Sequence, residues 1–174
     1  MHRAARLSNV LVFLVVLLSL GTGVPMVAAD ASDLQELERL AEDSFAQDDL
    51  VTATALYRQL AERLDPTREV DRAERVRVQM IVAWLEHLRG RDVAALQALT
   101  EALILDPDYA YQPELYDRPF SRLYDDARQR ASQQRQADAS RFAREGSDRL
   151  RAGDTDGARE LYRKALDAWP DETS

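Results

Sequence analysis

Few residues in this sequence have side chains that could support catalysis or bind a metal. The chain has two histidines, His2 and His87, and no cysteine. The short acidic runs "DDAR" and "DTD" lack the alternating oxygen ligands of a calcium-binding loop. No Ser/His/Asp set can be assembled from the sequence. A glycine-rich phosphate loop is not expected either, because Gly21 and Gly23 belong to an apolar N-terminal segment. We therefore expect no enzyme activity, no metal and no cofactor.

The N-terminal segment has the composition of a secretory signal. Arg3 and Arg6 precede an apolar run over residues 10–20, and small residues follow at Val27 and Ala29. This order predicts a signal peptide over residues 1–29, cleaved after Ala29 or two residues later. An uncleaved membrane anchor is the alternative, but the run is shorter than the ~20 residues that span a bilayer. We expect export without stable membrane insertion after cleavage.

The composition of the mature chain limits its location and partners. Residues 30–174 number 145, which suits one domain. Without Arg3 and Arg6, 23 − 2 = 21 basic residues face 31 acidic ones, a balance of −10. An acidic surface argues against nucleic acid and anionic membranes as partners. The absence of cysteine is ordinary in a bacterial periplasm, where we expect the protein to be located.

The chain predicts helices throughout. Apolar residues recur at three- and four-residue spacing, and no sustained alternation of β-branched and polar residues occurs. We therefore predict an all-α protein.

One pattern of small residues occurs three times. Its clearest copy has a glycine followed by residues at offsets of 5, 9, 12 and 17, and each copy also has a small residue seven positions before its first member. The copies are Gly146, Gly153, Ala158, Tyr162, Ala165 and Pro170; then Ala83, Gly90, Ala95, Leu99, Ala102 and Pro107; and Ala41, Asp48, Ala53, Tyr57, Leu60 and, one residue late, Pro66.

This pattern resembles the tetratricopeptide repeat (TPR), a pair of antiparallel helices of about 34 residues. Small residues allow two helices to cross closely, the larger Tyr or Leu fills the adjacent gap, and proline ends the second helix. The resemblance implies a TPR-like α-solenoid with about three helix pairs, and a groove lined by the first helix of each pair. It also implies that the chain binds a protein or peptide.

The three units are unevenly spaced along the chain. We predict a first unit over 30–66, a second over 67–108, a loop and connecting helix over 109–138, and a third unit over 139–174. The second unit's first helix is expected to start early, capped by Thr67. Helix restarts at residues 117–119 and continues to Arg151; the alternative is a break within residues 132–140.

The resemblance places several residues in the groove. Phe45, Met80 and Trp84 would form an apolar floor, with Glu38 and Glu42 beside it and His87 nearby. The alternative is that Phe45 and Trp84 are core residues between units. Well-known cytosolic family members hold a peptide's terminal carboxylate with Lys, Asn and Arg, which these positions lack, so such a clamp is not expected.

Four tyrosines gather around the loop: Tyr109, Tyr111, Tyr116 and Tyr124. We interpret them as a cover over the end of the second unit, with their hydroxyls at the surface. A platform for an aromatic or sugar ligand is the alternative.

The third unit is followed by no capping helix, so its stacking face would be open. We expect Leu161, Leu166 and Trp169 to pack against another polypeptide, either a second copy or a partner. The alternative is that the long helix folds back and docks this unit onto the second.

These patterns predict an exported interaction module that binds a protein or peptide partner in a bacterial cell-envelope complex. The alternative is a structural, self-assembling element with no ligand groove. A more remote alternative is a sugar-binding or enzymatic accessory protein.

Overall fold

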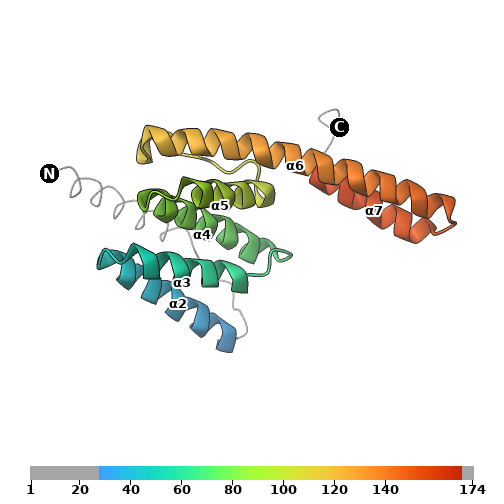
Figure 1. Cartoon of the computed structure of the whole chain (residues 1–174). Coiled ribbons are helices and arrows are strands. Elements are labelled where there is room, and N and C mark those ends of the chain that lie inside the picture. The colour runs from blue at the N-terminus through green and yellow to red at the C-terminus, as the bar shows by residue number, and fades with distance from the viewer. Residues whose placement is uncertain (1–27, 170–174) are drawn as a thin grey trace. The chain divides into compact units, whose positions relative to one another are not determined.

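The computed structural model describes residues 28–169, and every regular element in that range is a helix. In chain order the elements are α2 (Ala28–Ala46), α3 (Leu50–Arg63), α4 (Glu69–Leu88), α5 (Asp92–Leu105), the short 3₁₀ helix η1 (Pro113–Leu115), α6 (Arg118–Arg151) and α7 (Thr155–Ala168) (Figure 1). The predicted all-α class is therefore confirmed. The chain divides into two compact units, which we call the N-terminal unit, up to Ala127, and the C-terminal unit, from Arg128 on; they are distinct from the three repeat units.

Most of the predicted signal peptide, residues 1–27, lies outside the described residues. The predicted cleavage point after Ala29 falls in the first turn of α2. Between residues 28 and 169, no helix combines the length and apolar character that crossing a bilayer requires.

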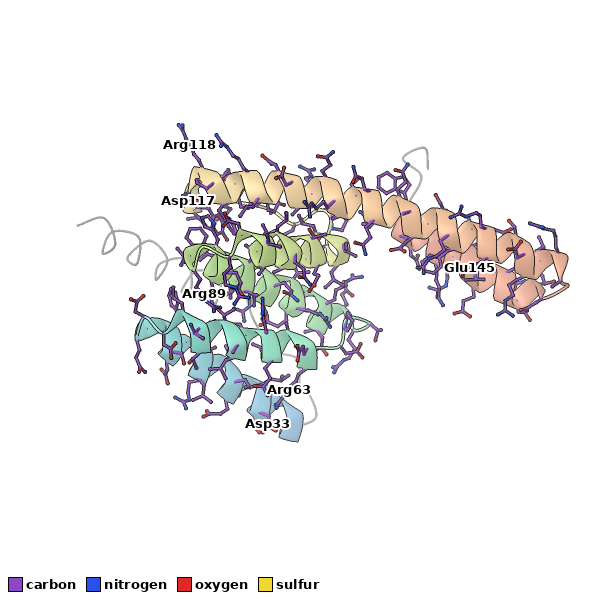
Figure 2. The ribbon with its side chains drawn as sticks, in the orientation of Figure 1. Asp33, Arg63, Arg89, Asp117, Arg118 and Glu145 are labelled. Atoms are coloured by element: carbon purple, nitrogen blue, oxygen red, sulfur yellow. The ribbon has the colours of Figure 1, made fainter. Side chains whose placement is uncertain are left out.

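The N-terminal unit contains two helix pairs. Helix α2 packs on α3, α4 packs on α5, and α3 packs on α4 to join the pairs. Asp33 near the start of α2 and Arg63 at the end of α3 lie at the same end of their pair, as expected for antiparallel helices (Figure 2). The core consists mainly of aliphatic and small side chains from α3, α4 and α5.

The small residues of the repeat lie where the sequence places close helix contacts. Ala41, Ala53, Ala83, Ala95 and Ala102 are all 0% exposed. Any larger side chain at these positions would separate the backbones or force its neighbours into strained rotamers. Burial therefore supports the predicted alignment of the first two units.

The three turns aligned by the sequence have the same backbone geometry. Asp48, Gly90 and Gly153 all adopt positive φ, at 60°, 73° and 85°. In each, the N–H of the turn residue donates to the carbonyl three residues back, and the next N–H donates to the carbonyl five residues back. This is the arrangement in which a left-handed residue ends a helix. Each following helix has 14 residues and begins two positions after the turn residue.

The second helices start with different caps. Asp49 and Asp154 accept hydrogen bonds from the backbone N–H three residues on, at 3.0 Å in both cases. Arg91 occupies the equivalent position before α5 and makes no such bond. The shared backbone turn therefore does not depend on the side-chain cap.

The expected extension of the second unit's first helix is present, but the predicted cap is wrong. Helix α4 begins at Glu69 after Arg68. The backbone N–H and hydroxyl of Thr67 both donate to Asp65 Oδ1, at 2.9 and 2.7 Å. Thr67 therefore completes the turn after α3 and does not cap α4.

Helix α6 is continuous, so the alternative of a break within residues 132–140 is wrong. Asp117 Oδ1 accepts the Phe120 N–H at 2.9 Å, and Pro119 lies in the first turn, where its missing donor costs nothing. The middle of the helix has few apolar residues, but arginine, glutamine and alanine all favour helix.

The C-terminal unit is a helical hairpin. Helix α7 packs on the C-terminal half of α6, where the ring of Tyr162 lies against Gly146 and its hydroxyl lies 3.0 Å from Ser147 Oγ. A Cβ on Gly146 would come within 3.1 Å of that ring. Ala158 is 2% exposed. The third copy of the pattern thus forms its own close helix contact.

Candidate functional site

Trp84 lies in a cluster of aromatic rings formed by α4, the following loop and the start of α6. Its ring centroid is 5.0 Å from Phe120 and 5.2 Å from Tyr116, both edge-to-face. Tyr111 stacks on Tyr124 with centroids 4.0 Å apart. These contacts bury Trp84 to 6% exposure, so the loop and α6 occupy the place where a partner would have to contact it.

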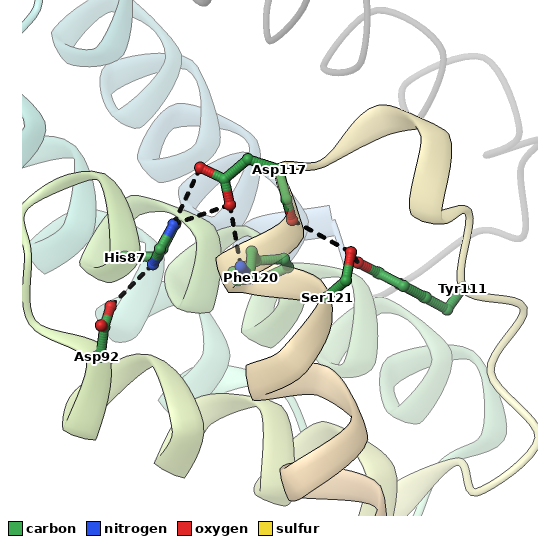
Figure 3. A network of polar contacts seen from close by, with 6 residues as sticks. All are labelled: His87, Asp92, Tyr111, Asp117, Phe120 and Ser121. Atoms are coloured by element: carbon green, nitrogen blue, oxygen red, sulfur yellow. Dashed lines mark hydrogen bonds and ion pairs between the residues drawn. The ribbon is translucent and has the colours of Figure 1, made fainter.

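His87 connects the same elements through its two ring nitrogens (Figure 3). Nδ1 lies 2.8 Å from Asp92 Oδ1, and Nε2 lies 3.2 Å from Asp117 Oδ1. A doubly protonated ring can donate to both carboxylates, whereas a neutral ring can donate to only one. His87 therefore ties the start of α5 to the residue that caps α6, with both nitrogens occupied.

The predicted apolar floor is part of the core. Phe45 is 4% exposed, Met80 0% and Trp84 6%, so the expectation that these side chains face a partner is contradicted and the alternative, core packing between helices, describes them. The tyrosine hydroxyls are also used internally: Tyr111 OH lies 2.9 Å from Ser121 Oγ, and Tyr124 donates to the Tyr109 carbonyl at 3.2 Å. Tyr116 covers Trp84, but the hydroxyls of Tyr111 and Tyr124 bond within the chain and not at the surface as expected from the sequence.

The charged residues predicted beside that floor lie on a face shared by α2 and α4. We call this the α2–α4 face and define it by Glu38 and Glu42 of α2 and Glu74 and Arg77 of α4. The Arg77 guanidinium donates to Glu38 across the two helices and to Glu74 one turn earlier on α4. Burial alone would lower the pKa of Arg77, but its bonds to Glu74 and Glu38 raise it instead. Arg77 is thus a fixed cation between two carboxylates.

Glu42 is the unpaired member of this face. Its side chain is half-buried, yet it makes no hydrogen bond or ion pair with another residue of the described range. Burial raises its pKa, the charge of Glu38 adds to that increase, and Arg77 offsets it only in part. The ionised carboxylate of Glu42 is therefore held in an unfavourable setting.

The Tyr57 hydroxyl lies in the same neighbourhood without a partner. Tyr57 of α3 is 1% exposed, and its hydroxyl has no hydrogen-bond partner within residues 28–169. Burial raises its pKa, and the nearby charge of Glu42 raises it further. A buried donor without an acceptor is uncommon, because losing its bond to water is costly.

A fully buried glutamate, in contrast, is paired with three arginines, although its Oε1 makes an ion pair without hydrogen-bond geometry. Glu86 of α4 is 0% exposed; Arg58 Nη2 of α3 lies 2.6 Å from its Oε1, and Arg89 and Arg91 contact its Oε2 at 3.2 and 3.4 Å. This cluster joins α3 to the end of α4. We interpret it as structural.

The three predicted contact residues of the third unit have different environments. Leu166 is 59% exposed, while Leu161 and Trp169 are half-buried. The Arg135 guanidinium lies 5.9 Å from the Trp169 ring, so α6 covers part of that ring. Leu150 of α6, which is 51% exposed, adds to the apolar surface of the hairpin.

Comparison of the chain with protein-family models, with curated proteins and with solved structures found no match. The TPR resemblance therefore rests on the residues of this sequence and on the repeated turns.

The sequence analysis placed Glu38 and Glu42 together and the structure agrees, but it missed two other residues of the site. Glu74 could have been found, because it stands three residues before Arg77 on the same helical face. Tyr57 was interpreted only as a packing residue, and no sequence signal distinguishes a buried hydroxyl with a partner from one without.

Proposed function

We propose that the chain is an exported TPR-type interaction module that binds a protein or peptide partner in a bacterial cell-envelope complex through its α2–α4 face. The observation that carries this proposal is the contact between Arg77 and Glu38, which joins the first helices of two successive pairs and leaves the charged side chain of Glu42 beside them. In repeat proteins of this kind, the stacked helices create extended binding surfaces.

Two further observations support the remaining parts of the proposal. The three matching turns and 14-residue helices support the TPR resemblance. The Arg3/Arg6 start, the apolar run and the small residues at Val27 and Ala29 support export. An acidic surface favours partners that present basic groups.

The proposal is tested by blocking the α2–α4 face during partner capture. The chain has no cysteine, so a bulky maleimide can be placed at one position. Gln35→Cys places the maleimide at an exposed position of α2, one turn before Glu38. Ala55→Cys places it at an exposed position of α3 and is the matched control. Tagged residues 30–174 would be used as bait in envelope extracts.

We expect a polypeptide that is retained by unlabelled bait and by bait labelled at 55, and lost when position 35 is labelled. Reciprocal purification with that polypeptide as bait should recover this chain. Retention that does not depend on the label at 35 would contradict the proposed face.

A self-assembling element is the second candidate, because the α6–α7 hairpin exposes Leu150 and Leu166. In that case the mass measured by light scattering after size-exclusion chromatography rises with concentration, and Leu166→Ser lowers it. A monomeric mass at all concentrations rejects self-assembly and leaves partner binding.

A further inference from the structure

We propose that Glu42 and Glu38, with the Tyr57 hydroxyl beneath them, form a binding site for one cationic side chain, an arginine or a lysine, of the partner polypeptide. This inference rests on the proposed function and specifies the chemistry of the α2–α4 face.

The charges of the face leave one carboxylate without a cation. Three glutamates and one arginine give 1 − 3 = −2. Arg77 is engaged by Glu38 and Glu74, with its Nε 3.0 Å from both oxygens of Glu74. Glu42, one turn beyond Glu38 on α2, forms no ion pair, and Arg77 is the one cation whose charge lowers its pKa.

The groups around Glu42 explain why it would accept a cation. Glu38 and Asp43 of its own helix act on it as like charges, and from α4 only Arg77 opposes them. The raised pKa of Glu42 follows from its burial first and from these charges second. A bound cation would offset both effects, because an opposite charge favours the ionised carboxylate.

Tyr57 supplies an independent sign that the arrangement is incomplete. Its side chain is 1% exposed, so the hydroxyl is shielded from water as well as without a partner in the described range. An ionised carboxylate has acceptor sites on both oxygens. With a cation holding Glu42 ionised from the solvent side, its second oxygen can accept the Tyr57 hydroxyl.

An arginine or lysine side chain fits this site better than a metal ion. Calcium takes six to eight oxygen ligands, more than Glu42, Glu38 and the Tyr57 hydroxyl together supply. A guanidinium or ammonium group requires only one or two carboxylates and can enter on a flexible stem.

The test is a titration of the mature chain, residues 30–174, followed by the backbone amide signals in NMR spectra. The probe is the capped peptide acetyl-Gly-Arg-Gly-amide; its matched control contains citrulline, which has the same shape without the charge. We expect saturable shifts in α2 around residues 38–45 and at Tyr57 with the arginine peptide, and no saturable shift with the citrulline peptide. A lysine peptide should shift the same signals.

Glu42→Gln keeps the size of the side chain and should weaken binding by about tenfold. Tyr57→Phe keeps the ring in the core and should weaken binding less. Glu62→Gln, at an exposed position of α3, should bind as the unmodified chain does. Equal shifts with citrulline, unchanged binding by Glu42→Gln, or no saturable shift at all would overturn the inference.

Failure of this inference can be distinguished from failure of the proposed function. A captured partner that binds the unmodified chain and Glu42→Gln equally leaves the interaction module in place and rejects the cation site. Arginine-peptide binding without any captured partner supports the cation site and counts against the interaction module.

Discussion

At the scale of single residues, two glutamates of the N-terminal unit have opposite environments. Glu86 is fully buried and contacted by three arginines. Glu42 is half-buried and contacts no cation within the described part of the chain. Buried charges in folded proteins are ordinarily paired. We therefore interpret Glu86 as a stabilising residue and Glu42 as a residue whose cation comes from elsewhere.

Replacing Glu42 should stabilise the chain in the absence of a partner. Its folded-state pKa is raised, mainly by burial, so the folded state loses stability relative to the unfolded state as the pH rises above the ordinary glutamate pKa. Glu42→Gln removes that penalty. We expect a gain of less than about 1 kcal/mol in the free energy of unfolding at pH 7, because the side chain is partly solvated.

The gain should disappear below about pH 4, where the unmodified glutamate is protonated in both states. Urea unfolding at both pH values measures this difference, and Glu62→Gln is the exposed control. A destabilised Glu42→Gln variant at pH 7 would mean that Glu42 already has a favourable partner.

Removing one arginine from the Glu86 cluster should destabilise the N-terminal unit. Arg58→Met keeps the length of the side chain but leaves Glu86 Oε1 without its ion pair. We expect a loss of about 1–3 kcal/mol, because an unpaired buried carboxylate oxygen retains its desolvation cost. Urea unfolding is followed by tryptophan fluorescence in a Trp169→Phe background, where Trp84 reports the N-terminal unit alone.

Arg63→Met is the matched control for Arg58→Met, because it removes an exposed arginine of the same helix. An equal effect from the two variants would show that helix propensity or net charge, not the ion pair, is responsible.

Sequence reasoning identified buried small residues better than it identified polar partners. Ala53 and Ala95 could be placed because helix crossings leave a periodic trace of small side chains. The contacts of Arg58 with Glu86 and of His87 with Asp117 join residues 28 and 30 positions apart. Such pairs depend on how neighbouring helices are rotated against each other, which hydrophobic spacing does not specify.

At the scale of elements, the turn between the two helices of each pair is the unit that repeats. Asp48, Gly90 and Gly153 share positive φ and the same hydrogen bonds. Glycine adopts this conformation readily, whereas a residue with a Cβ pays roughly 1 kcal/mol for it. The aspartate in the first turn is therefore the strained member of the set.

This comparison predicts opposite effects at two equivalent positions. Asp48→Gly should raise the free energy of unfolding of the N-terminal unit. Gly90→Ala should lower it, and each change should amount to about 0.5–1 kcal/mol. An added Cβ on Gly90 meets nothing within 4 Å, so backbone conformation alone is tested there. Effects of the same sign in urea unfolding would contradict the structural equivalence of the two turns.

Element boundaries were predictable where backbone chemistry is local. The start of α6 follows from Asp117 and Pro119, whose preferences act within one turn. The continuity of α6 was left open because its middle has strong helix propensity but few apolar residues to bury. Thr67 was misassigned because a threonine two residues after an aspartate can complete a turn as readily as it caps a helix.

At the scale of the whole molecule, the proposal of export makes a direct prediction. The charged start, the apolar run and the small residues before Asp30 predict removal of the signal peptide in the producing cell. N-terminal sequencing of the exported protein should begin at Asp30 or Ser32. Recovery of the chain with Met1 intact in a membrane fraction would indicate an anchor.

Binding of another polypeptide to the α2–α4 face can be tested directly by photo-cross-linking in the producing cell. A photoreactive amino acid is placed at Gln35 on α2, at Leu166 on α7, or at the exposed control position Ala55. We expect an adduct with a different polypeptide from position 35 and none from position 55. Adducts formed only from position 166, or only between copies of this chain, would contradict it.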